Sequence, residues 1–581
     1  MAAPRGRATR LALALALALG APLGALSAPP PPPPKTAGLR GVRAIVANAS
    51  AEDLERSLDS LLASIRLGAD AALLRRVGSI EAAMARTFQA LPKNEFGRLP
   101  PHGVRHVMRT YFATVSGWLI RGLEPGGMQV DTKHLHDVSI LSERAPALLE
   151  ALLEARSAGW GLSMESIAAL VVLVERLILE ESVQVLESAY EVTGFDVRQP
   201  LREQDLHTVL ATYLIMHEHG HAAHEVNESA IGELLEQVHT FDDPPCLADM
   251  ENDAVYNSLF DKRYAASPFG QKPQHFGFED ASRLARYLTR AYGKEQNIQC
   301  GLMKDHLVHL DRSGQGLVPL GSFYAQDPSM SYSFAESTEY LSKIGALEQP
   351  AQRAPSVRIA NYVLGPSNCI ASSAYFATCC FDECATLMGE LEGRVKAPAA
   401  SPERLLGLVS RMSSSSVDAP RRLSGSLSGR LHSIAAENGG EVPLHGRLFA
   451  QWMHRAFPHE CAHPHVAEDV KVLTTSHWED QDFYSTSDEM EAYVRLAAEG
   501  GLTDDAAPLT WSAGEVLPLQ ADARTSRWGS VGVGVVRAAA ALALGLVVLR
   551  LALAGWSAAS RAVAGAGAGD HSKPKAQPLP F

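Results

Sequence analysis

One stretch of the chain combines residue types that could hold a zinc ion. Residues 217–221 read His-Glu-His-Gly-His, which matches the metal-binding pattern His-Glu-x-x-His. On a helix, residues four positions apart lie on one face, so His217 and His221 could bind one zinc ion. Glu218 could then act as general base on a zinc-bound water. Downstream, Glu251 is the best candidate for a third protein ligand.

The same stretch admits two interpretations without catalysis. It is rich in histidine, since His219 lies inside the pattern and His224 continues it, so it could be a non-catalytic metal patch or a solvated polar helix end. Asn227 begins an Asn-Glu-Ser glycosylation acceptor, and a glycan there would crowd the proposed cleft. The catalytic interpretation predicts a zinc-dependent peptidase, which is the alternative function, and it makes zinc the second choice of cofactor after calcium.

Residues 459–465 form a second group of potential metal ligands. His459, Cys461, His463 and His465 have suitable side chains. However, the chain has seven cysteines, which in an oxidising compartment allow up to three disulfides with one thiol left over. Cys461 is therefore more simply a disulfide partner than a zinc ligand. The disulfide candidates are Cys369, Cys379, Cys380, Cys384 and Cys461.

A twelve-residue loop, 311–322, could offer oxygen ligands to a calcium ion. Side-chain oxygens occur at Asp311, Ser313 and Gln315, and Gly316 allows a sharp turn. Apolar segments with helical character precede and follow the loop. These features resemble the loop of the EF-hand family, a helix–loop–helix calcium-binding motif.

The resemblance implies specific roles within this loop. Asp311, Ser313 and Gln315 would be calcium ligands, joined by the backbone carbonyl of Leu317. Val318 would join the loop to a partner loop. However, Ser322 stands where the family has a bidentate glutamate, so the resemblance implies weak calcium binding or a loop kept only for its shape.

The turn within this loop recurs elsewhere in the sequence. The phrase Gly-x-Leu/Val-Pro begins at Gly97, Gly316 and Gly440, and residues 198–214 carry a looser version. The recurrence predicts a repeated helix–loop–helix unit. Residues 275–288 resemble the end of another such loop and its following helix, so we expect 250–348 to form one EF-hand-like pair.

Composition narrows the class of protein. The 581 residues are 46% hydrophobic and 20% charged, which indicates folded cores rather than disorder. The formal net charge is −13 and no basic segment stands out, which argues against nucleic acid as a partner. The sequence contains no nucleophile-elbow serine motif and no Walker A loop.

The two ends of the chain predict membrane targeting. Basic residues and an apolar block at 1–27 are typical of a signal peptide, and six prolines follow at 29–34. Residues 531–556 are long and apolar enough to predict one transmembrane helix. With glycosylation acceptors at Asn48 and Asn227, these features predict a secretory-pathway membrane protein at the cell surface, with a cytosolic tail.

We therefore expect a mainly α-helical fold with EF-hand-like helix–loop–helix repeats, little β-sheet and one C-terminal transmembrane helix. The predicted function is binding or scaffolding for an unknown protein partner at a membrane, with weak calcium binding. The predicted parts are a signal peptide (1–27), a Pro-rich linker (28–50), a helical domain with two repeats (51–245), an EF-hand-like pair (246–350), a Cys-containing helical domain with a fourth repeat (351–500), a stalk (501–530), the transmembrane helix (531–556) and a cytosolic tail (557–581).

Overall fold

The computed structural model describes most of the chain between residues 71 and 498. The described residues are 60, 62, 63, 65, 71–123, 128–130, 161–219, 247–266, 275–325, 334–349, 354–372, 375–465, 470–472 and 483–498. The predicted signal peptide, Pro-rich linker, stalk, membrane segment and tail lie outside them, as do Asn48, His221 and Asn227. All described residues belong to one compact unit, 1–519.

The described chain is mainly α-helical with short strands, which confirms the predicted mainly α fold with little β-sheet. The helices are α4 (Ala71–Ala90), α5 (Pro101–Val115), α7 (Met164–Val192), α8 (Glu203–His219), α10 (Leu247–Ala266), α11 (Phe278–Leu310), α12 (Leu320–Tyr324), α13 (Thr338–Lys343), α14 (Ile359–Val363), α15 (Glu383–Val395), α16 (Pro402–Val409), α17 (Gly425–Glu437), α18 (Arg447–Ala456) and α19 (Ser487–Ala498), with a 3₁₀ turn η2 (Pro366–Asn368). The strands are β1 (Trp118–Ile120), β2 (Met128–Val130), β3 (Leu317–Pro319), β4 (Leu347–Glu348), β5 (Ser356–Arg358), β6 (Phe376–Thr378), β7 (Ala399–Ala400), β8 (Val442–Pro443) and β9 (Val470–Val472).

Four of the antiparallel backbone pairings among the described residues organise these helices. Leu99 bridges Leu162, and Leu201 bridges Phe276. Strand β3 pairs with β5, so that Val318 faces Val357, and β7 pairs with β8, so that Ala400 faces Val442. A helix begins within a few residues after each paired segment. We call these four arrangements the first, second, third and fourth pair, in chain order.

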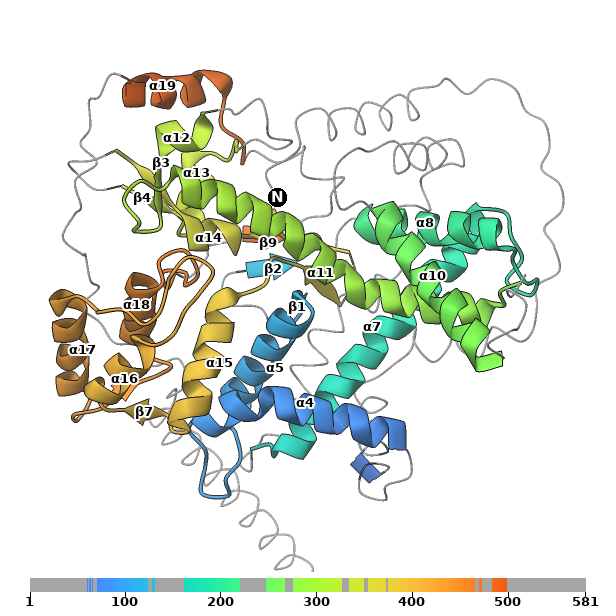
Figure 1. Ribbon diagram of the computed structural model, residues 1–581, viewed down its shortest axis with the longest axis horizontal. Coiled ribbons are helices and arrows are strands. Elements are labelled where there is room, and N and C mark those ends of the chain that lie inside the picture. Colours follow the sequence, from blue (N-terminus) through green and yellow to red (C-terminus); the bar gives the residue numbers. More distant parts are fainter. Residues whose placement is uncertain are drawn as a thin grey trace, which may run out of the picture. The chain divides into compact units, whose positions relative to one another are not determined.

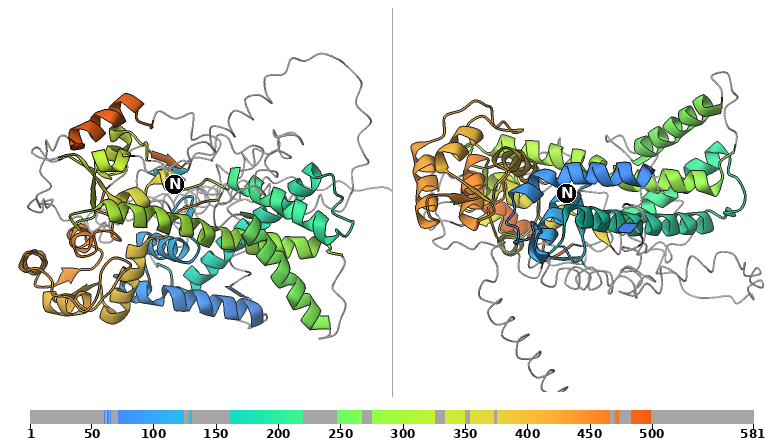
Figure 2. Two further views of the ribbon diagram at one scale, coloured as in Figure 1. Left: turned by 45° about the horizontal axis from the view of Figure 1, so that its top comes forward. Right: turned by 90° about the horizontal axis from the view of Figure 1, so that it is seen from below.

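Two long helices connect successive pairs. Helix α7 leaves the first pair and leads into the second, and α11 leaves the second pair and leads into the third. Figure 1 shows α11 as the long green helix that extends from α10 towards α12 and α14, in agreement with its packing against all three. Figure 2 shows α4 alongside α7, against which it packs.

Each pair has its own hydrophobic core. Ile80, Phe112 and Ile167 represent the first core, and Leu206, Phe276 and Leu288 represent the second. The third core contains Val318, Phe323 and Val357, and the fourth contains Val442, Phe449 and Trp452. The paired apolar residues of the last two pairs are themselves fully buried, so each β-pairing sits inside the core that it organises.

The strand pairing corrects one sequence expectation. The segment at 275–288 was expected to pair with the loop that contains Val318, within 250–348. Instead Phe276 bridges Leu201, and Val318 faces Val357. The reason is the 33-residue helix α11 between them, which at 1.5 Å per residue separates its two ends by about 50 Å.

The predicted membrane anchor is also corrected. Within the described part of the chain, no helix combines the length and the apolar character needed to cross a bilayer. Helix α7 is long enough at 29 residues, but charged residues such as Glu175, Arg176 and Glu181 interrupt it. This finding contradicts the predicted single-pass membrane location. The segment at 531–556 itself lies outside the described residues.

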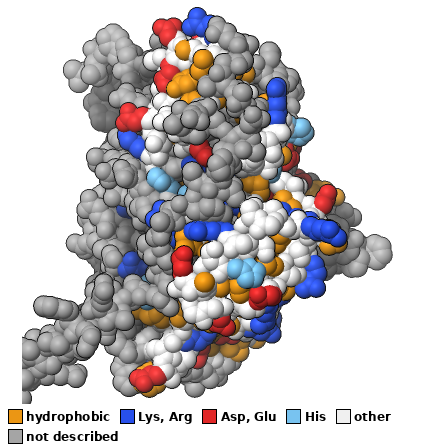
Figure 3. Space-filling view, turned by 90° about the vertical axis from the view of Figure 1, so that its left-hand side faces the viewer, with side chains coloured by type: hydrophobic (Ala, Val, Ile, Leu, Met, Phe, Trp, Pro, Cys, Tyr) orange, Lys and Arg blue, Asp and Glu red, His pale blue; other side chains and the backbone are white. Residues whose placement is uncertain are grey.

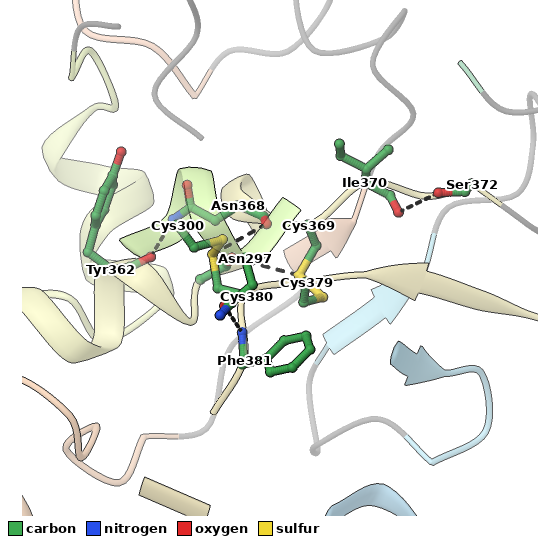
Figure 4. Close-up of a disulfide and its surroundings, with 11 residues drawn as sticks. Asn297, Cys300, Tyr362, Asn368, Cys369, Ile370, Ser372, Cys379, Cys380 and Phe381 are labelled. Atoms are coloured by element: carbon green, nitrogen blue, oxygen red, sulfur yellow. Dashed lines mark hydrogen bonds between the residues drawn. A yellow bond between two sulfur atoms is a disulfide. The ribbon is translucent and has the colours of Figure 1, made fainter. Parts of the chain in front are cut away.

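Three disulfides confirm the predicted cysteine chemistry. Cys384 pairs with Cys461, Cys369 with Cys379 and Cys300 with Cys380. Cys300 was not among the sequence candidates. It joins α11 to the segment after β6, as Figure 4 shows, next to the shorter Cys369–Cys379 link. Cys246 lies outside the described residues.

Candidate functional site

The loop at 311–316 is closed by its own hydrogen bonds. The Asp311 carboxylate accepts from the Ser313 backbone N–H at 2.9 Å and from the Ser313 hydroxyl at 2.7 Å. It also accepts from the backbone N–H groups of Gly314, at 3.0 Å, and Gly316, at 2.7 Å. The side chain is fully buried. The residue predicted as the first calcium ligand is therefore already engaged within the loop.

A histidine that is distant in the sequence also hydrogen-bonds to the Asp311 carboxylate. His459 lies just before the Cys384–Cys461 disulfide, and its Nε2 is 2.9 Å from Asp311 Oδ2. Its other ring nitrogen, Nδ1, is 2.8 Å from the hydroxyl of Ser416. Because an ionised carboxylate only accepts, Nε2 donates to Asp311. The loop is thus tied to the fourth pair through one imidazole.

The other residues that were predicted to bind calcium make contacts within the protein. Leu317 lies in β3 opposite Arg358, and the hydroxyl of Ser313 is used by Asp311. The backbone N–H of Gln315 donates to the Ser313 hydroxyl at 3.2 Å. Ser322, at the position of the missing glutamate, lies within α12. The contacts described for these groups are therefore contacts within the protein.

The network extends to a buried carboxylate. Glu460 Oε1 accepts from the hydroxyls of Ser414 at 2.9 Å, Ser415 at 3.1 Å and Ser416 at 2.7 Å. Lys304 of α11 lies 3.5 Å from the same oxygen. Ser415 also contacts Lys304 and Glu383 of α15, each at 2.8 Å, so the serine run at 413–416 connects α11, α15 and the segment after α18.

Lysine and serine contacts keep the carboxylates of this network ionised. Burial alone would raise the pKa of Asp311, but hydrogen bonds from His459, Ser313 and Gly316 outweigh it and lower the pKa below its usual value. Burial would likewise raise the pKa of Glu460, while Lys304 and the serine hydroxyls lower it. Both groups therefore bear a negative charge at neutral pH.

Ser416, His459 and Asp311 have the composition of a catalytic triad, but their surroundings oppose that chemistry. The imidazole is turned the opposite way from a serine hydrolase, since Nδ1 faces the serine and Nε2 the aspartate. The ionised Glu460 lies 2.7 Å from Ser416 Oγ, where it would repel an oxyanion. The N–H groups of Ser416 and Val417 already donate within the network.

Of the His-Glu-x-x-His segment, residues 217–219 form the end of α8, which belongs to the second pair. His217 is buried in α8, and its ring packs near Tyr213, Tyr292 and Phe376, with centroids 5.0–6.1 Å away. Glu218, the predicted general base, follows it, and α8 ends at His219. These contacts favour a packing role for the His217 ring.

The predicted third zinc ligand faces a different histidine. The two carboxylate oxygens of Glu251 lie 3.0 and 2.8 Å from Nδ1 of His207. His207 precedes His217 by ten residues on the same helix, α8. His221 lies outside the described residues. Among described contacts, Glu251 serves as the partner of His207.

The histidines at 459–465 do not gather around one point. His459 enters the Asp311 network, and Cys461 forms its disulfide. His465 Nε2 lies 2.9 Å from the backbone carbonyl of Lys343, and the backbone N–H of His463 donates to Asn361. Burial lowers the pKa of His463 to about 4, with further lowering from nearby arginines.

Sequence reasoning missed a cluster of two histidines and a carboxylate. His106 of α5, Glu392 of α15 and His445 after β8 place their ligand-type atoms within 4.8 Å of one another. Burial, with Arg109 and His445, lowers the pKa of His106 well below its usual value, so this imidazole is neutral. The only signal in the sequence is that His106 and His445 each follow a Gly-x-Leu/Val-Pro phrase.

Comparison with known proteins gives no relative on which to base a function. No protein-family model, no curated protein and no solved structure matches the chain.

Proposed function

We propose that the chain is a non-enzymatic scaffold whose helix–loop–helix pairs resemble EF-hands but hold their arrangement without calcium. The observation that carries this proposal is the state of Asp311. Its buried carboxylate accepts four hydrogen bonds from its own loop and a fifth from His459. A calcium ion would have to displace the imidazole to use that oxygen, and no glutamate replaces the lost bond.

The proposal assigns the molecule the binding of a protein partner rather than catalysis. Support comes from the groups that would otherwise suggest an enzyme. Ser416 lies against the ionised Glu460, and Glu251 is paired with His207. Among the described residues on the face in Figure 3, charged side chains of both signs are interspersed, which does not favour a charged polymer as the partner.

A calcium titration tests the proposal. We expect no heat when calcium up to the millimolar range is added to the full chain, and unchanged hydrogen exchange at the paired amides of β3 and β5. Those amides form backbone hydrogen bonds between β3 and β5 in the core of the third pair. Calcium-dependent heat that disappears in Asp311→Asn, together with slower exchange at β3 in calcium, would reject a calcium-independent scaffold.

A further inference from the structure

We propose that His106, Glu392 and His445 form a binding site for a divalent transition-metal ion, with zinc as its best-matched metal. The three side chains come from α5, α15 and the turn between β8 and α18, and their ligand-type atoms all lie within 4.8 Å. Sequence separation between His106 and His445 exceeds three hundred residues, so the fold itself creates this cluster.

The donor set matches zinc chemistry. Zinc binds imidazole nitrogens and carboxylate oxygens, and two histidines with one carboxylate form a recurrent set that leaves a fourth position for water. Hard ions such as calcium and magnesium prefer shells made of oxygen, which two imidazoles do not supply. The site therefore differs in ligand chemistry from the loop at Asp311.

The ligand atoms are close to the spacing that a metal requires. Nε2 of His445 lies 2.8 Å from Oε1 of Glu392. Two ligands bound at about 2.0–2.2 Å in a tetrahedral arrangement lie about 3.4 Å apart. The two atoms would therefore have to move only slightly farther apart to bind the ion. The ion would take the place of the hydrogen on Nε2, and the neutral imidazole would then carry its hydrogen on Nδ1. Both side chains are almost fully buried, at 9% and 3% exposed.

A second contact orients the carboxylate. The hydroxyl of Thr87 on α4 donates to the other oxygen, Oε2 of Glu392, at 2.6 Å. This leaves Oε1 to contact His445. Outer contacts of this kind hold metal ligands in position, and their loss commonly weakens metal binding 10- to 100-fold. Thr87 is therefore a positioning residue of the proposed site.

One contact opposes the ion and identifies the nitrogen that binds it. Nη2 of Arg109 lies 3.4 Å from Nδ1 of His106. A guanidinium only donates, so Nδ1 accepts in the metal-free protein, and Nε2 is the nitrogen on the other side of the ring. When Nε2 binds a metal, Nδ1 carries the hydrogen, and this long contact to Arg109 is lost.

The proposed ion would link distant parts of the fold. His106 belongs to α5 of the first pair, whereas Glu392 and His445 belong to the fourth pair. The rings of His106 and His445 are already in edge contact, with centroids 5.4 Å apart. Metal binding would therefore fasten the first pair to the fourth, in addition to the packing of α4 and α5 against α15.

Metal titration of the full chain tests the site. After chelator treatment, zinc is added and binding is followed by calorimetry, with cobalt as a spectroscopic substitute. We expect one equivalent of zinc that is bound at least about 100-fold more weakly by His106→Ala, Glu392→Gln or His445→Ala. Thr87→Val should weaken it about 10-fold. His432→Ala removes an exposed histidine that pairs with Glu403, and should change nothing.

A measurement on the unaltered chain guards against variants that fail to fold. X-ray absorption at the zinc edge reports the types of atom bound to zinc in the natural protein. We expect a first shell of nitrogen and oxygen atoms that includes two imidazoles and no sulfur. A shell without imidazole, or zinc binding that all three ligand variants retain, would overturn the proposal.

Discussion

Two copies of the same turn have different surroundings. Gly97 and Gly316 both adopt positive φ, at 69° and 75°, two residues before the paired residues Leu99 and Val318. Around Gly97, an added Cβ would meet nothing within 4 Å. At Gly316 it would collide with the backbone carbonyl of Pro458. The first turn needs glycine only for its backbone angle, and the second also needs it for close packing.

The difference shows where the fold adds long-range links to a repeated shape. The segment against Gly316 continues into His459, Glu460 and Cys461, which bind Asp311, the serine run and Cys384. At the other turn, the backbone N–H of Gly97 donates to the carbonyl of nearby Asn94, and the Asn94 side chain accepts from the backbone N–H of Arg98. The turn itself is therefore closed by local hydrogen bonds, whereas the third pair also carries the cross-link to the fourth pair.

Removal of the Cys384–Cys461 disulfide should have the largest effect on this comparison. The bond closes a loop of 77 residues and holds the segment that contacts Gly316. Loop-closure entropy predicts a loss of about 4.5 kcal/mol for the double Cys→Ser variant, against about 2.7 kcal/mol for Cys369–Cys379, whose separation is 10. Urea unfolding followed by circular dichroism measures both. A smaller loss for the longer loop would contradict the assigned role.

Alanine at the two glycines tests the comparison directly. We expect Gly97→Ala to cost about 1 kcal/mol, because only its positive φ opposes a side chain. Gly316→Ala should cost about 3 kcal/mol, since a collision with Pro458 adds to the same backbone penalty. Unfolding midpoints of the two variants give the difference. Equal losses would mean that the loop is not held against Pro458.

Acid should weaken the link at Asp311 before it weakens the turn at Gly97. The pKa of Asp311 is depressed in the folded protein, so its contribution to stability is complete above the unfolded pKa of about 3.9 and is lost as pH falls through the folded value. The stability difference between the natural chain and Asp311→Asn should therefore be constant near neutrality and shrink below about pH 4. A stability difference that grows as the pH falls would contradict this prediction.

Sequence reasoning predicted the parts of the fold that depend on local patterns. Helical periodicity and the Gly-x-Leu/Val-Pro phrase located the turns at Leu99, Val318 and Val442, because a positive-φ glycine followed by an apolar residue is a local requirement. Their partners Leu162 and Val357 lack the phrase, so the pairings themselves were not visible.

The candidate sites depend on contacts that no local pattern encodes. Asp311 and His459 are 148 residues apart, and Thr87 and Glu392 are 305 residues apart. The contacts of the serine run with Glu460 and Lys304 also join residues far apart in the sequence. The loop resembled a damaged calcium site because its ligand types are local, whereas the imidazole that occupies its carboxylate is not.

The most direct test of the central claim is the stability of Asp311→Ala in the absence and presence of calcium. We predict that this variant loses about 3 kcal/mol in chelator, because it leaves His459 and the loop N–H groups without their buried acceptor, and that calcium changes neither protein. Asp305→Ala, at an exposed position on α11, is the control and should be neutral. The account is contradicted if the variant matches the natural chain in chelator and only the natural chain is stabilised by calcium.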